Sequence, residues 1–268
     1  MNTYKINLFT ILVVCVFGIL LFGITTESAS EDKPIDSPLE QEIDGFIKQY
    51  RIQNKLTNTD KTSFVVYDLY QNKKLVSINE DTERTSASLI KNFVMLVYFH
   101  EVKQGRLSHT NTNRQHLKRM IGVSSNTSTN YFINLIGGPN KVNRILKANY
   151  GYFKQTRIEE RIPATGRTDK NTTSAQDLNK FYIQLWDNKL PFSDKMNWYF
   201  GLQNGDYIYK RTSIPTSVKG VNKTGTVYRL IKDSGILVLR DPIGNPRPYV
   251  FIKMIEDETK TNNRLKTE

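Results

Sequence analysis

The chain has 268 residues, of which 38% are hydrophobic and 11% aromatic, and this is enough apolar material for a packed core. Its one cysteine, Cys15, excludes an intrachain disulfide and, further along the chain, a thiolate metal cluster or a cysteine nucleophile. The histidines His100, His109 and His116 form no H-E-x-x-H pattern. We therefore expect no metal site and no cofactor.

The chain has 38 Lys and Arg residues against 26 Asp and Glu residues, a formal net charge of +12. A basic protein can bind acidic lipid, an anionic wall polymer or nucleic acid. The basic residues are spread over many segments, and the sequence contains no helix-turn-helix, zinc module or aromatic RNA-binding motif. We expect no nucleic-acid partner, and most of the positive charge then serves solubility.

Residues 1–30 have the composition of a targeting segment. Lys5 precedes an uncharged apolar run over residues 8–24, and small polar residues follow it. This pattern is typical of an export signal, and the run also reaches the minimum length of a membrane span. Two alternatives follow, a signal peptide that is removed or a membrane anchor that is retained. Either one predicts an exported protein that is periplasmic, secreted or anchored to the outer face of the cytoplasmic membrane.

The rest of the chain is predicted to be a linker over residues 31–38, one domain over 39–258 and a polar tail over 259–268. Apolar residues at helical spacing predict a helix from near Pro38. Runs rich in β-forming residues predict a hairpin of strands at 63–69 and 74–78.

Helices dominate the middle of the domain. Residues 88–104 are apolar on nearly all sides, which predicts a central buried helix. Shorter helices are expected at the following ranges: 127–135, 139–148 and, after the capping residue Ser174, to Asp187. Strands are expected at 218–222, 235–239 and 249–255. Because the first and last strands must pair across the helices, we predict an α+β fold: an antiparallel five-stranded sheet packed with helices, plus a helical lobe.

Ser88 and Lys91 form an S-x-x-K pattern at the start of the buried helix. A spacing of three places both side chains on one helical face, and Ser88 also meets the positive end of the helix dipole. A serine hydroxyl needs a base that takes its proton, and a lysine in an apolar site can be neutral enough to act as one. Alone the pattern is weak, since an exposed first helical turn can show it by chance.

Two further patterns follow in order. Ser124-Ser125-Asn126 precedes a predicted helix, where a polar turn is an equally good interpretation. Lys223-Thr224-Gly225-Thr226 stands at the end of a predicted strand, where its glycine permits close approach of a ligand or another backbone, or simply forms a turn. Each pattern is modest by itself, and their joint order in an exported chain is far more specific.

This ordered set resembles the motifs of the penicillin-recognising serine hydrolases, and most nearly those of the class A β-lactamases. Similar segments extend beyond the motifs, at the following ranges: 87–91, 120–130, 136–139, 156–158 and 172–174. The resemblance covers roughly residues 40–255 and implies a β-lactamase/transpeptidase-like fold. It also implies a small-molecule β-lactam or a peptidoglycan-derived peptide as the partner, and we expect a monomer.

The resemblance implies a role for each matching residue. Ser88 attacks the carbonyl and becomes acylated, and Lys91 takes or relays its proton. Ser124 passes a proton to the leaving nitrogen. Lys223 lowers the pKa of that hydroxyl and attracts the substrate carboxylate.

The substrate-binding residues are implied in the same way. Thr224 or Thr226 hydrogen-bonds the carboxylate, beside Gly225, and Asn126 holds Lys91 and a substrate amide. The oxyanion would lie between the backbone N–H groups of Ser88 and Thr226, and such donors lower a barrier by several kcal/mol.

The sequence departs from the class A pattern in four places. No E-x-x-L-N segment supplies the glutamate that activates water, and the loop that should carry it is short. Glu159 and Glu160 are the nearest carboxylates, although solvated loop charges explain them as well. Ser125 replaces the usual aspartate, the stretch between Lys91 and Ser124 is short, and the C-terminal helix is missing or very short.

These observations predict a serine hydrolase that acts on cyclic amides and has the groups for acylation, with deacylation in doubt. The leading interpretation is β-lactamase-like hydrolysis, with a slowly released acyl-enzyme. The alternatives are a D,D-peptidase-like enzyme on peptidoglycan peptides, a penicillin-binding sensor or binding module without turnover, and a pseudoenzyme. The joint presence of all four candidate catalytic residues argues against the last.

Overall fold

The computed structural model describes residues 35–163, 170–203, 214, 218–227 and 230–256. The predicted targeting segment and the predicted polar tail over 259–268 lie outside these residues. Within the described ranges, no helix is both long and apolar enough to cross a membrane.

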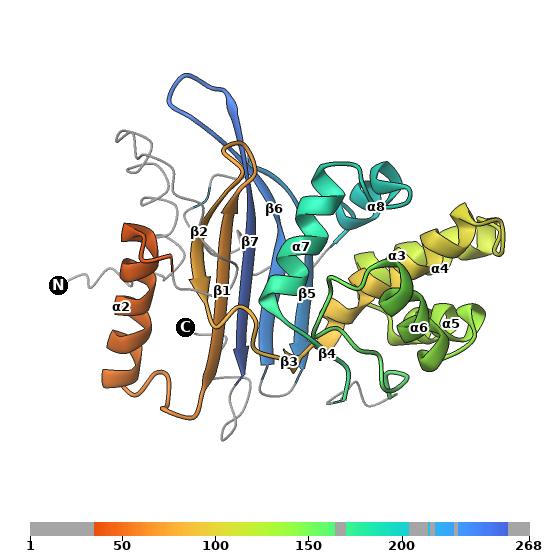
Figure 1. Cartoon of the computed structure of the whole chain (residues 1–268), viewed down its shortest axis with the longest axis horizontal. Coiled ribbons are helices and arrows are strands. Elements are labelled where there is room, and N and C mark those ends of the chain that lie inside the picture. Colours follow the sequence, from red (N-terminus) through yellow and green to blue (C-terminus); the bar gives the residue numbers. More distant parts are fainter. Residues whose placement is uncertain (1–34, 164–169, 204–213, 215–217, 228–229, 257–268) are drawn as a thin grey trace.

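A five-stranded antiparallel sheet forms the centre of the fold, in the order β2-β1-β7-β6-β5 (Figure 1). Its strands are β1 (Lys61–Asp68), β2 (Lys73–Ile78), β5 (Lys219–Val227), β6 (Leu230–Arg240) and β7 (Pro246–Glu256). β1 pairs with β7 from Lys61↔Glu256 to Asp68↔Tyr249, so strands from the two ends of the domain meet across the helical middle. The predicted fold class and hairpin are confirmed.

The last three strands are longer than the sequence predicts. β5 pairs continuously with β6 from Lys219↔Val238 to Val227↔Leu230. Lys223 was expected at the end of a strand that stops at residue 222, and it lies instead in the middle of β5. Cross-strand pairing with β6 holds the polar residues of β5 extended, although their own preference for strands is weak.

The sheet is covered on both faces. Val65 belongs to the apolar core that includes α3 (Ile90–Lys103), whereas its neighbours Phe64 and Val66 belong to a second core with α2 (Pro38–Ile52). Successive side chains of a strand point to opposite faces, so these two cores lie on opposite sides of the sheet. α7 (Ala175–Trp186) packs against β7 and β1 on the α3 side.

The helical lobe gathers at the β5 side of the sheet, away from α2 (Figure 1). It contains α3, α4 (Asn111–Gly122), α5 (Asn126–Ile136), α6 (Pro139–Asn149) and α8 (Ser193–Phe200). α3 is buried from Ile90 to Glu101, as predicted for a central helix. α4 and α8 were not predicted: α4 is mostly polar with a few buried apolar residues, and α8 has 8 residues.

Two short elements fix the chain where α3 begins. β3 (Arg84–Thr85) pairs with β4 (Thr172–Thr173), which ties the segment before Ser88 to the segment before α7. Ser88 itself lies in the 3₁₀ turn η1 (Ala87–Leu89), and α3 starts at Ile90 rather than at Ser88 as predicted.

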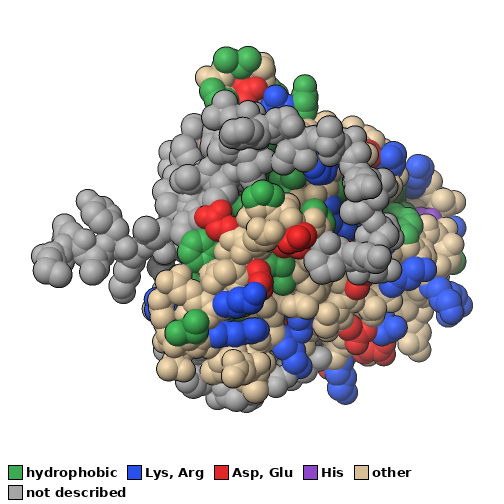
Figure 2. All heavy atoms as spheres, turned by 60° about the vertical axis from the view of Figure 1, so that its left-hand side comes forward, with side chains coloured by type: hydrophobic (Ala, Val, Ile, Leu, Met, Phe, Trp, Pro, Cys, Tyr) green, Lys and Arg blue, Asp and Glu red, His purple; other side chains and the backbone are tan. Residues whose placement is uncertain are grey.

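Basic side chains do not gather into one stripe on the face shown in Figure 2, where blue Lys and Arg side chains alternate with red acidic ones and tan surface. This scatter is the arrangement expected if most of the positive charge is ordinary surface charge.

Candidate active site

Ser88 and Lys91 lie one helical turn apart at the junction of η1 and α3. The Lys91 Nζ atom donates a hydrogen bond to Ser88 Oγ at 2.7 Å. Lys91 is fully buried, whereas Ser88 is partly exposed. The predicted shared face is therefore present, with the amine in the interior and the hydroxyl at the surface of the site.

Four oxygen atoms surround the Lys91 amine. It donates to the Ser124 carbonyl oxygen at 2.7 Å and to Asn126 Oδ1 at 2.9 Å, and Ser124 Oγ also lies 2.9 Å away. The carbonyl and amide oxygens can only accept, so they occupy two N–H groups of the amine. The third tetrahedral direction of the nitrogen faces the hydroxyl groups of Ser88 and Ser124. In a neutral amine this direction holds the lone pair.

The loop between α4 and α5 brings Ser124 and Asn126 to Lys91. Ser124 has a positive φ of 56°, and Ser125 caps α5 by accepting a hydrogen bond from the Ser128 N–H at 3.2 Å. The two interpretations of this segment are thus compatible, since it is a polar turn before a helix and also contacts Lys91. Ser125, at the position of the usual aspartate, serves as the helix cap.

Lys223 approaches from β5 and is fully buried. Its Nζ atom donates to Gln203 Oε1 at 2.8 Å and to the Thr224 carbonyl at 2.9 Å. Burial lowers the pKa of Lys223 to about 7, against the opposing effect of Asp233. Gln203 follows α8, and sequence reasoning missed it because α8 itself was not predicted.

The two buried lysines lie near enough to influence each other. Burial, and then the positive charge of Lys223, lower the pKa of Lys91 well below its ordinary value. The S-x-x-K and K-T-G segments, more than a hundred residues apart in the chain, therefore meet in one electrostatic environment. A lowered pKa makes the neutral amine accessible at moderate pH.

Gly225 sets the distance between β5 and η1. A Cβ added there would lie 3.2 Å from Leu89 Cγ, 3.3 Å from Ala87 Cβ and 3.3 Å from the Ser88 nitrogen. The backbone of β5 thus runs directly beside the Ser88 N–H, as an oxyanion hole shared by Ser88 and Thr226 requires. Thr226 adds a buried hydroxyl oxygen with no hydrogen-bond partner among the described residues.

Two non-glycine residues with left-handed backbone stand next to the candidate groups. Ala87 has a φ of 46° and precedes Ser88, and Ser124 has a φ of 56°. Such conformations cost of order 1–3 kcal/mol each and are concentrated at functional sites. The surrounding packing therefore holds Ser124, and the residue that precedes Ser88, in a backbone conformation that non-glycine residues rarely adopt.

A family model described as the β-lactamase enzyme family matches residues 38–114 and 109–267, which is most of the chain. The chain belongs to this β-lactamase family. The resemblance on which the sequence analysis relied is thereby confirmed.

Solved structures share the fold at low sequence identity. PBP-A is 17% identical with a TM-score of 0.69, and the match covers 90% of this chain and 96% of that one. A mutant of PBP-A described as an acyl-enzyme complex with penicillin G is 18% identical, with a TM-score of 0.67 and coverage of 84% and 93%. A β-lactamase from Xanthomonas campestris pv. campestris is 16% identical, with a TM-score of 0.68 and coverage of 84% and 93%. No curated protein matches the chain.

Glu159 and Glu160, the candidate deacylation residues of this β-lactamase-family chain, make no described contact with Ser88 or Lys91. Both backbone N–H groups donate to Asn171 Oδ1, at 2.8 and 3.0 Å. The Glu160 carboxylate accepts from the Lys170 N–H at 3.4 Å, and Glu159 is exposed. Residues 164–169 of the same loop lie outside the described residues.

The neighbouring arginines do not pair with these glutamates. Arg157 forms an ion pair with Glu83 at 2.5 Å, and Arg161 donates to Asn134 Oδ1 at 2.6 Å. The loop is instead fixed by hydrogen bonds between side chains and its backbone, with Asn130 Oδ1 accepting from the Ile162 N–H at 2.8 Å.

A buried lysine–glutamate ion pair contacts the segment that precedes Ser88. Lys232 on β6 is fully buried, donates to the Thr85 carbonyl oxygen and pairs with Glu256 at 2.5 Å. Burial lowers its pKa to about 8, which Glu256 opposes. These residues were missed by sequence reasoning, although a lysine inside an apolar strand is a signal that could have identified them.

Across the described ranges, no acidic, histidine or cysteine residues cluster as a metal site would require.

Proposed function

We propose that Ser88 forms an acyl-enzyme with a β-lactam or a related wall-peptide amide. Ser88 Oγ attacks the amide carbonyl carbon while its proton moves to Lys91. The backbone N–H groups of Ser88 and Thr226 stabilise the oxyanion. The carbon–nitrogen bond then breaks, Ser124 delivers its hydroxyl proton to the leaving nitrogen, and Lys91 passes the proton it took from Ser88 to the Ser124 oxygen, 2.9 Å away.

The proposal rests on one observation, the 2.7 Å separation of Lys91 Nζ and Ser88 Oγ with the amine fully buried. Its described hydrogen-bond partners are hydroxyl, carbonyl and amide oxygens, and none is a carboxylate. A neutral Lys91 is thus the base that stands within reach of the Ser88 proton.

Lys223 is suited to recognise the substrate carboxylate. Thr224 is buried beside it, and the Thr226 hydroxyl is unpartnered within the described residues. With a pKa of about 7, Lys223 is largely protonated in mildly acidic solution, where it attracts an anion. In this proposal the neutral Lys91 transfers the proton and the charged Lys223 binds the substrate carboxylate.

Release of the acyl group is proposed to be slow. Attack of water on the ester needs a base, and neither Glu159 nor Glu160 is described in contact with Ser88 or Lys91. The same observation supports the alternative of a D,D-peptidase-like enzyme or a penicillin-binding sensor, because both need acylation and neither needs rapid hydrolysis of penicillin. The apolar run at residues 8–24 supports action outside the cytoplasmic membrane.

The test is incubation of the domain with a fluorescent penicillin, followed by a denaturing gel and by assay of a chromogenic cephalosporin. We expect persistent label on the wild type, no label on Ser88→Ala and slow cephalosporin turnover. Absence of both label and turnover would refute the β-lactam proposal.

Rapid turnover without trapped label would retain Ser88 as nucleophile and refute slow release. Glu160→Gln then tests the nearest carboxylate, and Glu159→Gln is its matched control on the same loop. Loss of turnover in Glu160→Gln alone would assign that residue as the base.

A further inference from the structure

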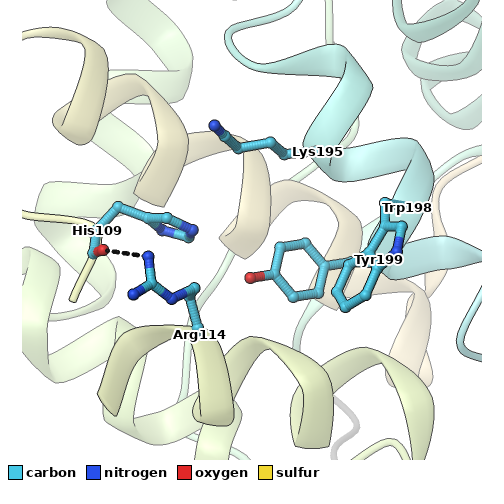
Figure 3. Close-up of a pocket in the computed structure, with 5 residues that line it drawn as sticks. All are labelled: His109, Arg114, Lys195, Trp198 and Tyr199. Carbon is cyan, nitrogen blue, oxygen red and sulfur yellow. Dashed lines mark hydrogen bonds between the residues drawn. The ribbon is translucent and has the colours of Figure 1, made fainter. Parts of the chain in front are cut away.

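A pocket of about 290 Å³ lies outside the candidate active site, between the N-terminal part of α4 and α8. His109 and Arg114 line it from the α4 side, and Lys195, Trp198 and Tyr199 line it from α8 (Figure 3). The His109 ring and the Tyr199 hydroxyl point toward the space between the two helices (Figure 3). The size is close to the lower limit for small-molecule sites.

The pocket is positively charged. Arg114 and Lys195 both line it, Lys118 lies 5.5 Å from the centre of the Trp198 ring, and no carboxylate is among the lining residues. The positive charges of Arg114 and Lys195, after burial, lower the pKa of His109, which agrees with their convergence on one space. Such a site favours an anionic ligand.

The cationic side of the pocket is held in place by hydrogen bonds. Arg114 donates to the His109 carbonyl at 3.3 Å and to Asn111 Oδ1. The His109 Nδ1 atom lies 3.0 Å from the hydroxyl of the buried Tyr98. A guanidinium that is already oriented loses less conformational entropy when it binds an anion.

Aromatic surface forms the other side. Trp198 is 53% exposed, which is unusual for the largest apolar side chain, and Tyr199 packs beside it with ring centres 5.0 Å apart. A bare inorganic anion would gain nothing from this surface. A sugar ring presents a flat face of C–H groups that can cover an exposed indole.

We propose that this pocket binds an anionic sugar unit, with its phosphate or carboxylate held by Arg114 and Lys195 and its ring packed against Trp198. Carbohydrate polymers that bear such groups are the class of partner that this chemistry fits.

The pocket would place the enzyme near such a polymer without blocking the candidate active site. The pocket lies beside the N-terminal part of α4 and along α8, whereas Ser124 and Gln203 follow the C-terminal ends of these helices. Their C-terminal ends touch, because a Cβ on Gly122 would lie 3.1 Å from the Leu202 carbonyl oxygen. From the pocket-lining residue Arg114 to Gly122, α4 rises by about 12 Å.

Intrinsic fluorescence of the full chain tests this proposal. The chain has two tryptophans, Trp186 and Trp198, so Trp186→Phe leaves Trp198 as the reporter. Titration with glucose-6-phosphate should change its fluorescence with a Kd on the order of 1 mM. Neutral glucose and inorganic phosphate should each bind at least about tenfold more weakly.

Charge removal provides the matched control. In the Trp186→Phe background, Arg114→Gln and Lys195→Gln should each weaken glucose-6-phosphate binding by about tenfold. Lys147→Gln removes the same charge from the exposed surface of α6 and should leave binding unchanged. The penicillin reaction is not used in this test, so its outcome is independent of the proposed acylation.

Several results would overturn the proposal. The first two are no binding of glucose-6-phosphate, and binding of inorganic phosphate as tight as that of glucose-6-phosphate. The third is a loss of affinity in Lys147→Gln equal to that in Arg114→Gln and Lys195→Gln. The fourth is tighter binding of adenosine monophosphate than of glucose-6-phosphate, which would indicate a nucleotide site. Thermal unfolding of each variant verifies that loss of binding does not reflect loss of the fold.

Discussion

The proposed reaction requires a neutral Lys91 and a protonated Lys223. Lys91 accepts a proton only when it is neutral, and its pKa is lowered well below the ordinary value by burial and by Lys223. Lys223 attracts a carboxylate only when it is protonated, and burial lowers its pKa to about 7. The charge state of Lys91 thus depends on Lys223, because a charged Lys223 favours a neutral Lys91.

We predict a bell-shaped dependence of the acylation rate on pH. The rate should rise as Lys91 loses its proton and fall above about pH 7 as Lys223 loses its own. Lys223→Arg keeps its charge at high pH, so the falling limb should move to higher pH while the rising limb remains. The measurement is the second-order rate constant for penicillin labelling across pH. An unchanged falling limb in Lys223→Arg would contradict the assignment.

The same residue predicts a stability effect. The folded pKa of Lys223, about 7, is lower than that of an unfolded lysine, so the unfolded state binds more protons between these values. The free energy of unfolding of the wild type should therefore increase with pH above about 7. Below about pH 7 the folded protein buries a protonated Lys223, and the full destabilising cost of that buried charge applies. The free energy of unfolding of Lys223→Met minus that of the wild type should be larger at about pH 6 than at about pH 9, by about 2 kcal/mol.

Chemical unfolding at both pH values measures this difference. Lys147→Met on the exposed surface of α6 is the control and should show no such dependence. A difference between Lys223→Met and the wild type that does not vary with pH would mean that Lys223 is charged in the folded protein throughout this range.

At the scale of elements, two glycines of the same strand pair have different consequences. A Cβ on Gly225 would meet Ala87, Leu89 and the Ser88 nitrogen at 3.2–3.3 Å. A Cβ on Gly235 would lie 2.4 Å from the Val221 carbonyl oxygen and 2.7 Å from Asn222 Cβ. The first glycine permits β5 to approach η1, and the second permits β5 and β6 to pair.

Gly225→Ala is therefore expected to slow acylation at least about tenfold and to lower the free energy of unfolding by only about 1 kcal/mol, because Leu89 can yield slightly. Gly235→Ala should cost about 3 kcal/mol or prevent folding, since it clashes with backbone. Thermal unfolding and penicillin labelling measure the two effects. If Gly225→Ala acylates at the wild-type rate, the close approach of β5 to Ser88 has no catalytic significance.

The success of sequence-based prediction also differs between elements. α3 and the β1–β2 hairpin were predictable because their apolar periodicity is strong. The ends of β5 were not, since Lys223 and Thr224 are held in the strand by pairing with β6. α4 was missed because its packing depends on a few residues, Leu117, Met120 and Ile121, in a mostly polar sequence.

The candidate site was predictable to a comparable extent. Three short motifs identified Ser88, Lys91, Ser124, Asn126 and Lys223, and the structure brings the first four into direct hydrogen-bond contact. Gln203, Lys232 and Glu256 were missed because their importance arises from contacts between distant segments. The catalytic role of each residue stays a prediction.

At the scale of the whole molecule, the candidate site lies where the sheet meets the helical lobe. η1 and α3 supply Ser88 and Lys91, the α4–α5 loop supplies Ser124 and Asn126, and β5 supplies Lys223. A buried network ties these parts together, as Asn92 on α3 donates to the Tyr182 hydroxyl, which donates to the Ser234 carbonyl of β6. The geometry of the site thus depends on the packing of the lobe against the sheet.

The central claim is that a neutral Lys91, and no carboxylate, takes the Ser88 proton. The most direct test follows the penicillin adduct over time by intact-protein mass spectrometry in the wild type, Lys91→Met and the double variant Glu159→Gln/Glu160→Gln. We predict that Lys91→Met acylates at least about a thousandfold more slowly. The double variant should acylate at the wild-type rate. Near-normal acylation of Lys91→Met, or a comparable loss in the double variant, would contradict this mechanism.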